Sequence, residues 1–124
     1  KKNTATLRNL NILYYKGVSV GEIILEQPYN FYNGYNFPTD GQWVSGHTLP
    51  LKVYYSFYTP SRGLSLSGKL YYDHQSSRVV YNSNSFRWKA VKTLLTEVSL
   101  KLSHSLSKDH LGKRLSEGLS YGLE

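Results

Sequence analysis

The chain has 124 residues, which is enough for one domain and too few for two separate hydrophobic cores. Its 15 Lys and Arg against 8 Asp and Glu give a net charge of +7, which favours anionic partners such as nucleic acid, acidic glycans or anionic lipid. The absence of cysteine excludes disulfides, zinc–thiolate sites and thiol nucleophiles, and no apolar run approaches the roughly 18–20 residues that a membrane-spanning helix needs.

The first two predicted elements form a β-hairpin. Residues 5–15 and 18–26 are both rich in Leu, Ile, Val and Tyr, and β-branched and aromatic residues favour strands. Lys16-Gly17 lies between the two segments and is typical of a tight turn.

Residues 27–42 are predicted to be a long loop, because Pro, Gly, Asn and Asp interrupt the strand pattern. The loop contains three successive triplets, Tyr29-Asn30-Phe31, Tyr32-Asn33-Gly34 and Tyr35-Asn36-Phe37, and Trp43 follows closely. Binding loops use this combination, because rings give large contact areas at low entropy cost and Asn supplies adaptable donors and acceptors. In a second interpretation the rings fold back over an open end of the sheet, and Asn supplies turn geometry.

Strands resume at 42–48 and 51–58, and the region 51–81 predicts an antiparallel meander. Over 51–58 and 64–72 apolar residues alternate with Lys, Ser and Tyr, which is the pattern of half-buried strands. Turn signals at 60–63 and 73–77 separate these strands from each other and from a short strand at 78–81.

The C-terminal third predicts a helix. After N-cap candidates at 82–85, apolar residues recur at spacings of three and four, which favours an amphipathic helix over 86–98. Helix and strand both remain open for 99–106, because residues there also alternate as in a strand. The helical stripe consists of Trp88, Val91, Leu95, Val98, Leu102 and Leu106.

The predicted fold class is a single β-rich α+β domain over residues 1–107. It combines an antiparallel sheet or small sandwich of about six to seven strands with one C-terminal amphipathic helix, and an all-β sandwich is the alternative. Residues 108–124 carry glycines at 112, 118 and 122, so we expect a flexible tail or a segment that a partner orders.

No motif predicts catalysis or metal binding. Gly17-Val18-Ser19-Val20-Gly21 matches the Gly-x-Ser-x-Gly pattern of a nucleophile elbow, but that motif requires a strand-to-helix turn, whereas a strand follows here. The histidines His47, His74, His104 and His110 lack the spacing of a ligand set, and no cluster of carboxylates completes one. We therefore expect no enzymatic activity, no metal and no cofactor.

The leading functional hypothesis is a non-catalytic recognition domain of a surface, secreted or virion protein. Its ligand would be a glycan or a protein, bound by the aromatic-Asn loop, and an extracellular, cell-surface or virion location is favoured over the cytoplasm. The candidate contact residues are Tyr29, Tyr32, Asn33, Tyr35, Asn36, Phe37 and Trp43.

Two alternatives rest on other parts of the chain. In the first, the domain binds single-stranded nucleic acid without sequence preference, with sheet tyrosines stacking on bases and a basic segment neutralising phosphates. The residues for that role are Tyr54, Tyr58, Tyr71, Tyr81, Arg87, Lys89 and Lys92. In the second, the domain is a structural subunit of an assembly and forms homo-oligomers through its strand edges.

Overall fold

The structure is a computed structural model, and it describes residues 4–59, 63–92 and 97–123, with the backbone alone for 90–92 and 97. Its described residues form strands and turns and contain no helix. The strands are β1 (Thr4–Tyr15), β2 (Val18–Asn30), β3 (Tyr35–Asn36), β4 (Trp43–Val44), β5 (Leu51–Thr59), β6 (Leu64–Asp73), β7 (Arg78–Lys92), β8 (Glu97–Lys108) and β9 (Arg114–Leu123).

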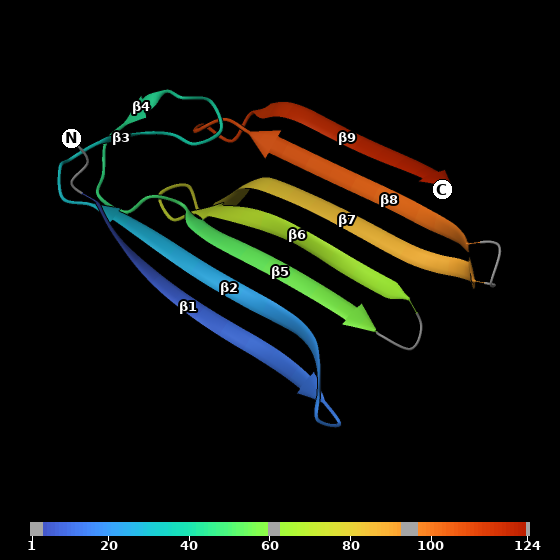
Figure 1. Cartoon of the computed structure of the whole chain (residues 1–124). Coiled ribbons are helices and arrows are strands. Elements are labelled where there is room, and N and C mark those ends of the chain that lie inside the picture. The colour runs from blue at the N-terminus through green and yellow to red at the C-terminus, as the bar shows by residue number, and fades with distance from the viewer. Residues whose placement is uncertain (1–3, 60–62, 93–96, 124) are drawn as a thin grey trace.

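Seven of these strands form one antiparallel sheet in the order β1-β2-β5-β6-β7-β8-β9, so each strand pairs with its neighbours in the chain (Figure 1). The short β3–β4 hairpin belongs to the loop between β2 and β5 and interrupts this succession. Strands β1 and β9 are the edges of the sheet, each with a neighbour on one side only.

The first hairpin and the central meander are confirmed. Strands β1 and β2 pair from Thr4↔Asn30 to Tyr15↔Val18, and Lys16 and Gly17 both adopt positive φ angles in the connecting turn. Strands β5, β6 and β7 pair in sequence, as the alternating pattern predicts. The strand predicted at 42–48 is limited to the two residues of β4.

The predicted C-terminal helix is wrong. Residues 78–92 form one continuous strand, β7, and residues 97–108 form β8, which pairs with it. Residues 93–96, on which part of that prediction falls, lie outside the described residues. The physical reason is that β6 and β8 pair with β7 on both sides, and the serines at 99, 103, 105 and 107 favour the two-residue repeat over a helix.

The all-β alternative is therefore the class that the structure supports. The C-terminal residues continue this pattern, because β9 pairs with β8 from Lys108↔Arg114 to Leu100↔Leu123. That residues 108–124 are flexible, or are ordered by a partner, stays a prediction.

The two faces of the sheet differ in chemistry. The register aligns one row across all seven strands, consisting of Leu13, Gly21, Phe57, Leu66, Phe86, Leu102 and Tyr121. We call the face that carries this row the apolar face. The next row lies on the opposite face, because successive side chains alternate, and consists of Ile12, Glu22, Ser56, Ser67, Ser85, Ser103 and Ser120. We call that side the serine–lysine face.

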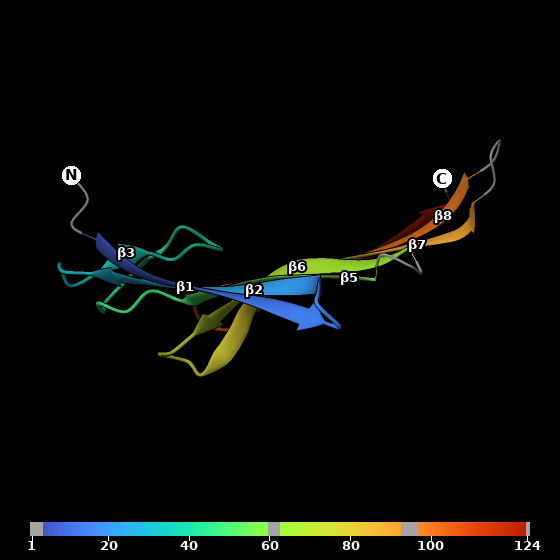
Figure 2. The ribbon, with the colours of Figure 1, turned by 60° about the horizontal axis from the view of Figure 1, so that its bottom comes forward.

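The buried core is small and lies at one end of the serine–lysine face. Tyr35 and Phe37 from the loop cover Val80, which is the extra residue of a bulge between β6 and β7. Val44, Leu49 and Tyr71 pack around them. Figure 2 shows the sheet as a single layer of strands with the loop at one end, so most of both faces has no second layer over it.

Candidate functional site

The aromatic-Asn loop is held in shape by its own amides. The side chain of Asn30 donates to the Gly34 carbonyl oxygen at 2.6 Å, and the side-chain oxygen of Asn33 accepts from the Gly46 N–H at 2.9 Å. His47 adds a bond between its Nδ1 and the Asn30 carbonyl oxygen at 2.8 Å. Two of the amides in the repeat therefore fix the backbone of the loop, which is the geometric role of the second interpretation above.

The rings of the repeat divide into two groups. Tyr35 and Phe37 point into the core, where Phe37 is 2 % exposed. Burial and, after it, the neighbouring carboxylate of Asp73 raise the pKa of Tyr35. In contrast, Tyr32 is 60 % exposed and Trp43 is 65 % exposed. Tyr29 is partly exposed, and its ring stacks on His47 with centroids 5.6 Å apart.

Tyr32 and Trp43 line a cleft of about 730 Å³ at this end of the sheet, which we call the aromatic cleft. Thr4 and Thr6 of β1 and Lys52 of β5 also line it, as do Asn36 and Tyr35. Of the seven residues predicted to contact a ligand, the cleft brings together Tyr32, Tyr35, Asn36 and Trp43. No sequence pattern pointed to Thr4, Thr6 or Lys52, because only the pairing of β1, β2 and β5 brings them beside the loop.

Trp43 keeps its position because Gly34 leaves room for it. Gly34 has a φ of 132°, which favours glycine, and a Cβ atom at this position would overlap the indole ring. The indole therefore lies against the backbone of the loop while much of its surface stays open to solvent.

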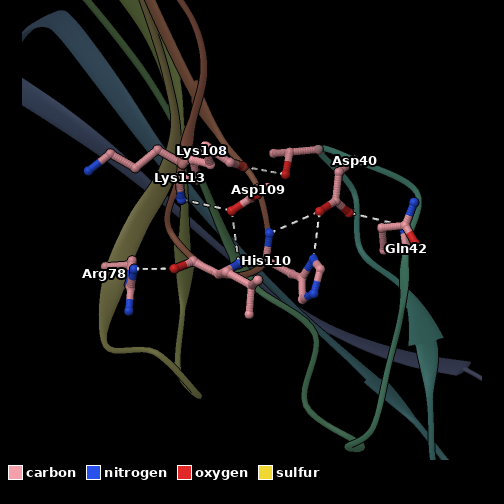
Figure 3. Close-up of polar contacts among 9 residues, drawn as sticks. Asp40, Gln42, Arg78, Lys108, Asp109, His110 and Lys113 are labelled. Carbon is pink, nitrogen blue, oxygen red and sulfur yellow. Dashed lines mark hydrogen bonds and ion pairs between the residues drawn. The ribbon is translucent and has the colours of Figure 1, made fainter.

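The tip of the loop is fastened to the turn between β8 and β9 (Figure 3). One carboxylate oxygen of Asp40 bonds to the His110 Nδ1 at 2.7 Å and accepts the His110 backbone N–H at 3.0 Å. The hydroxyl of Thr39 donates to the Lys108 carbonyl oxygen at 2.5 Å. On the other side of the turn, Arg78 Nη1 donates to the Leu111 carbonyl oxygen at 2.7 Å. The contacts of Thr39 and Asp40 therefore hold the middle of the loop against the β8–β9 turn, although Asp40 and His110 are 70 residues apart.

The pKa of Asp40 lies below its ordinary value of 3.8. The largest single influence, desolvation by burial, raises it, but hydrogen bonds from the His110 ring and from the backbone N–H groups of Gln42 and His110 together outweigh burial. Because the folded-state pKa is lower than the unfolded one, Asp40 contributes stability above pH 3.8, and this contribution is lost as pH falls through the folded-state pKa.

We expect Asp40→Asn to reduce the acid sensitivity of the fold. The free energy of unfolding, measured by urea titration at pH about 6 and pH about 3, should fall less in the variant than in the unmodified chain. The reason is that the variant lacks the carboxylate that must be protonated in acid. An equal fall in both proteins would show that ionisation of Asp40 does not contribute to the pH dependence of stability.

The four tyrosines of the nucleic-acid alternative lie on the serine–lysine face, and two of them, Tyr71 and Tyr81, contact each other. The rings of Tyr71 and Tyr81 lie 5.0 Å apart, with Lys52 Nζ over Tyr71 and Lys69 Nζ over Tyr81. Burial, followed by Tyr71 and Glu26, raises the pKa of Tyr54. The remaining residues of that hypothesis are Tyr58, whose hydroxyl bonds to Ser19 at 2.9 Å, Arg87 and Lys89, which both have polar or ring partners, and Lys92, whose side chain lies outside the described residues.

Ser19, the serine of the Gly-x-Ser-x-Gly match, lies in strand β2 immediately after a hairpin turn. Within residues 4–59, 63–92 and 97–123, no group of three or more His, Cys, Asp or Glu side chains is placed to hold a metal ion. In the same part of the chain, no helix has the length and apolar character needed to cross a membrane.

Comparison with known proteins adds no relative: no family model, no curated protein and no solved structure matches this chain.

Proposed function

We propose that the chain is a non-catalytic recognition domain that binds a carbohydrate in the aromatic cleft. The observation that carries this proposal is the pairing of two exposed rings, Tyr32 and Trp43, with polar side chains inside one concave surface of about 730 Å³. An extracellular, cell-surface or virion location, where such ligands are found, is part of the proposal.

The chemistry of the cleft suits a sugar. The flat faces of an indole and a phenol ring can stack on the C–H faces of a sugar ring, and removing such an area from water is favourable. The hydroxyls of Thr4 and Thr6 and the amide of Asn36 can exchange hydrogen bonds with sugar hydroxyls. Lys52 adds a positive charge to the wall, which favours an acidic sugar over a neutral one.

The cleft is also held in place before a ligand arrives. Hydrogen bonds of the Asn30 and Asn33 side chains fix the loop backbone, and the contacts of Thr39 and Asp40 hold its tip. A ligand that meets a preorganised site loses less affinity to ordering of the protein.

Glycan-array screening followed by calorimetric titration tests the proposal. Trp43→Ala and Tyr32→Ala should each weaken binding of the sugar identified on the array by at least about tenfold, because an aromatic side chain that acts as a binding hot spot contributes about 2 kcal/mol or more. Tyr14→Ala, which removes an equally exposed ring from the opposite end of β1, is the matched control and should leave affinity unchanged.

Three results would contradict this function. One is the absence of sugar binding on an array that includes acidic glycans, and another is binding that neither Trp43→Ala nor Tyr32→Ala alters. The third is tight, salt-sensitive binding to single-stranded oligonucleotides that survives both substitutions, since this result would favour the tyrosines of the serine–lysine face.

A further inference from the structure

No second layer of described residues covers the apolar face (Figure 2). Beside the row that defines it, the register places Leu64, Trp88, Leu100 and Leu123 in a second apolar row at the end of the sheet near the β5–β6 connection. Charged side chains gather on the other face, where Arg8 pairs with Glu26 at 3.2 Å. Two further rows of the apolar face begin at Asn11 and Asn9 on β1. Among the described residues of these four rows, Glu117 on β9 is the one charged residue.

The exposed area of the chain is too large for a compact monomer. The chain exposes 8527 Å², whereas a folded monomer of 14.2 kDa is expected to expose about 6,800 Å². The excess of roughly 1,700 Å² is about twice the 800 Å² that each partner buries in an interface of standard size. Two copies that each buried this area would bury about 3,400 Å² in total, which falls in the range of obligate homodimers.

A polar stripe crosses the middle of the apolar face. It consists of Asn9, Asn11, Tyr55, Asn82, Asn84 and His104, which lie in two neighbouring rows of the register and are interspersed there with apolar residues such as Ile23, Leu25, Val53 and Leu70. The side chain of Asn84 donates to the Asn82 side-chain oxygen at 2.7 Å, and the Tyr55 hydroxyl donates to Asn84. Each Asn side chain carries two N–H donors and an oxygen that can accept two hydrogen bonds. Donors and acceptors that are unused within one copy can therefore pair with those of the same side chain in a second copy.

We propose that the apolar face is the docking surface for a second copy of this chain, so that two sheets pack face to face as a sandwich. A twofold interface brings the same patch from both copies together, and an amide stripe can pair with itself across that axis. The hydrocarbon of a lipid would offer no hydrogen-bond partner to the donors and acceptors that the stripe leaves unused within one copy, and burying such groups in an apolar medium is unfavourable. Packed sheets with apolar inner faces and charged outer faces are a common architecture.

This inference is independent of the proposed function. The loop that forms the aromatic cleft covers one end of the serine–lysine face, which stays on the outside of the pair. The dimer would therefore display two clefts outward, and the lysines of the two copies would be separated by both sheets.

Sedimentation equilibrium of the whole chain tests the proposal. We expect a mass of twice 14.2 kDa that high salt does not reduce, because Glu117 is the one charged residue among the described residues of the apolar rows. The double variant Leu102→Lys, Leu119→Lys should weaken dimerisation by at least about 100-fold, since it buries unpaired charges in the interface. These side chains are 37 % and 72 % exposed in the single chain, so the monomer should still fold.

The matched control is Leu10→Lys, Ile12→Lys. It adds the same charge at two exposed apolar positions, but on the serine–lysine face of an edge strand, and should leave the dimer intact. Because the chain has no cysteine, single thiols supply a second measurement. A thiol in Leu102→Cys should be protected from maleimide at dimer concentrations, whereas one in Ser103→Cys, on the other face, should react freely.

Each contrary outcome overturns the proposal. If the chain stays monomeric at high concentration, the apolar face does not bind a second copy. If the monomer instead binds phosphatidylcholine vesicles through Leu102 and Leu119, the apolar face binds lipid. A dimer that survives Leu102→Lys, Leu119→Lys, with both thiols equally reactive, would be held by the strand edges instead of the face.

Discussion

Replacing Phe37 by alanine is expected to lower the free energy of unfolding by about 3–4 kcal/mol, which is large for a domain of this size. Phe37 is 2 % exposed and is one of the three described residues of the buried hydrophobic cluster. Its removal would leave a cavity between the loop and Val80 that the fastened loop cannot close. Urea titration followed by circular dichroism measures the change.

Phe31→Ala is the matched control, because Phe31 occupies the corresponding place in the first triplet of the repeat but is 56 % exposed. It should change the free energy of unfolding by less than about 1 kcal/mol. Equal losses in the two variants would show that the repeat does not divide into buried and exposed rings. If the aromatic cleft binds a sugar, Phe37→Ala should also weaken that binding, because it releases the loop that carries Trp43.

Gly68→Ala is the second substitution with a large expected effect, a loss of about 2–3 kcal/mol. Gly68 lies in the middle of β6, and a Cβ atom there would overlap the backbone oxygen of Ser83 and the hydroxyl of Tyr55. The clash with backbone cannot be relieved by turning a side chain, so the pairing of β6 with β7 must shift. Thermal unfolding and urea titration both report the loss.

Gly122→Ala tests whether this effect is steric. Gly122 also lies in a strand, but nothing approaches the position of its missing Cβ within 4 Å. Alanine there should leave stability unchanged or raise it by about 0.4–1 kcal/mol, because it reduces the freedom of the unfolded chain. Similar losses at Gly68 and Gly122 would mean that close packing on Gly68 does not decide the result.

The strands of the central meander could be predicted because their signal is local. Over β5 and β6 most apolar residues alternate with Lys, Ser and Tyr, and a two-residue period places each set on its own face whatever the partner strand is. The hairpin of β1 and β2 could also be predicted from the local sequence, since Lys16-Gly17 already provides the turn. The clustering of charge on one face follows from the same alternation.

The helix prediction failed because two periods coexist in one segment. Trp88, Val98 and Leu102 fit a helical stripe, yet Leu100, Leu102 and Leu106 also fit a strand, and the local sequence does not choose between them. The choice comes from pairing: β7 is flanked by β6 and β8, and these contacts join residues far apart in the chain. A helix at this place would have left β6 as an open edge.

The candidate site shows the same limit. The repeat identified the loop as unusual, but its triplets are nearly identical, so nothing local distinguishes the buried Phe37 from the exposed Phe31. Thr4, Thr6 and Lys52 line the cleft only because strand pairing places them beside the loop. The Asp40–His110 contact likewise joins residues that are 70 positions apart.

The sequence by itself therefore determined a basic, cysteine-free chain with an aromatic-Asn loop and alternating strands that separate apolar from charged side chains. These properties depend on composition and on neighbours one to four residues apart. The tertiary structure alone decided that β7 and β8 are strands, which rings of the loop are buried, and which residues form the aromatic cleft. Those outcomes depend on hydrogen bonds and packing between distant segments, whose free energies are set only once the whole sheet has formed.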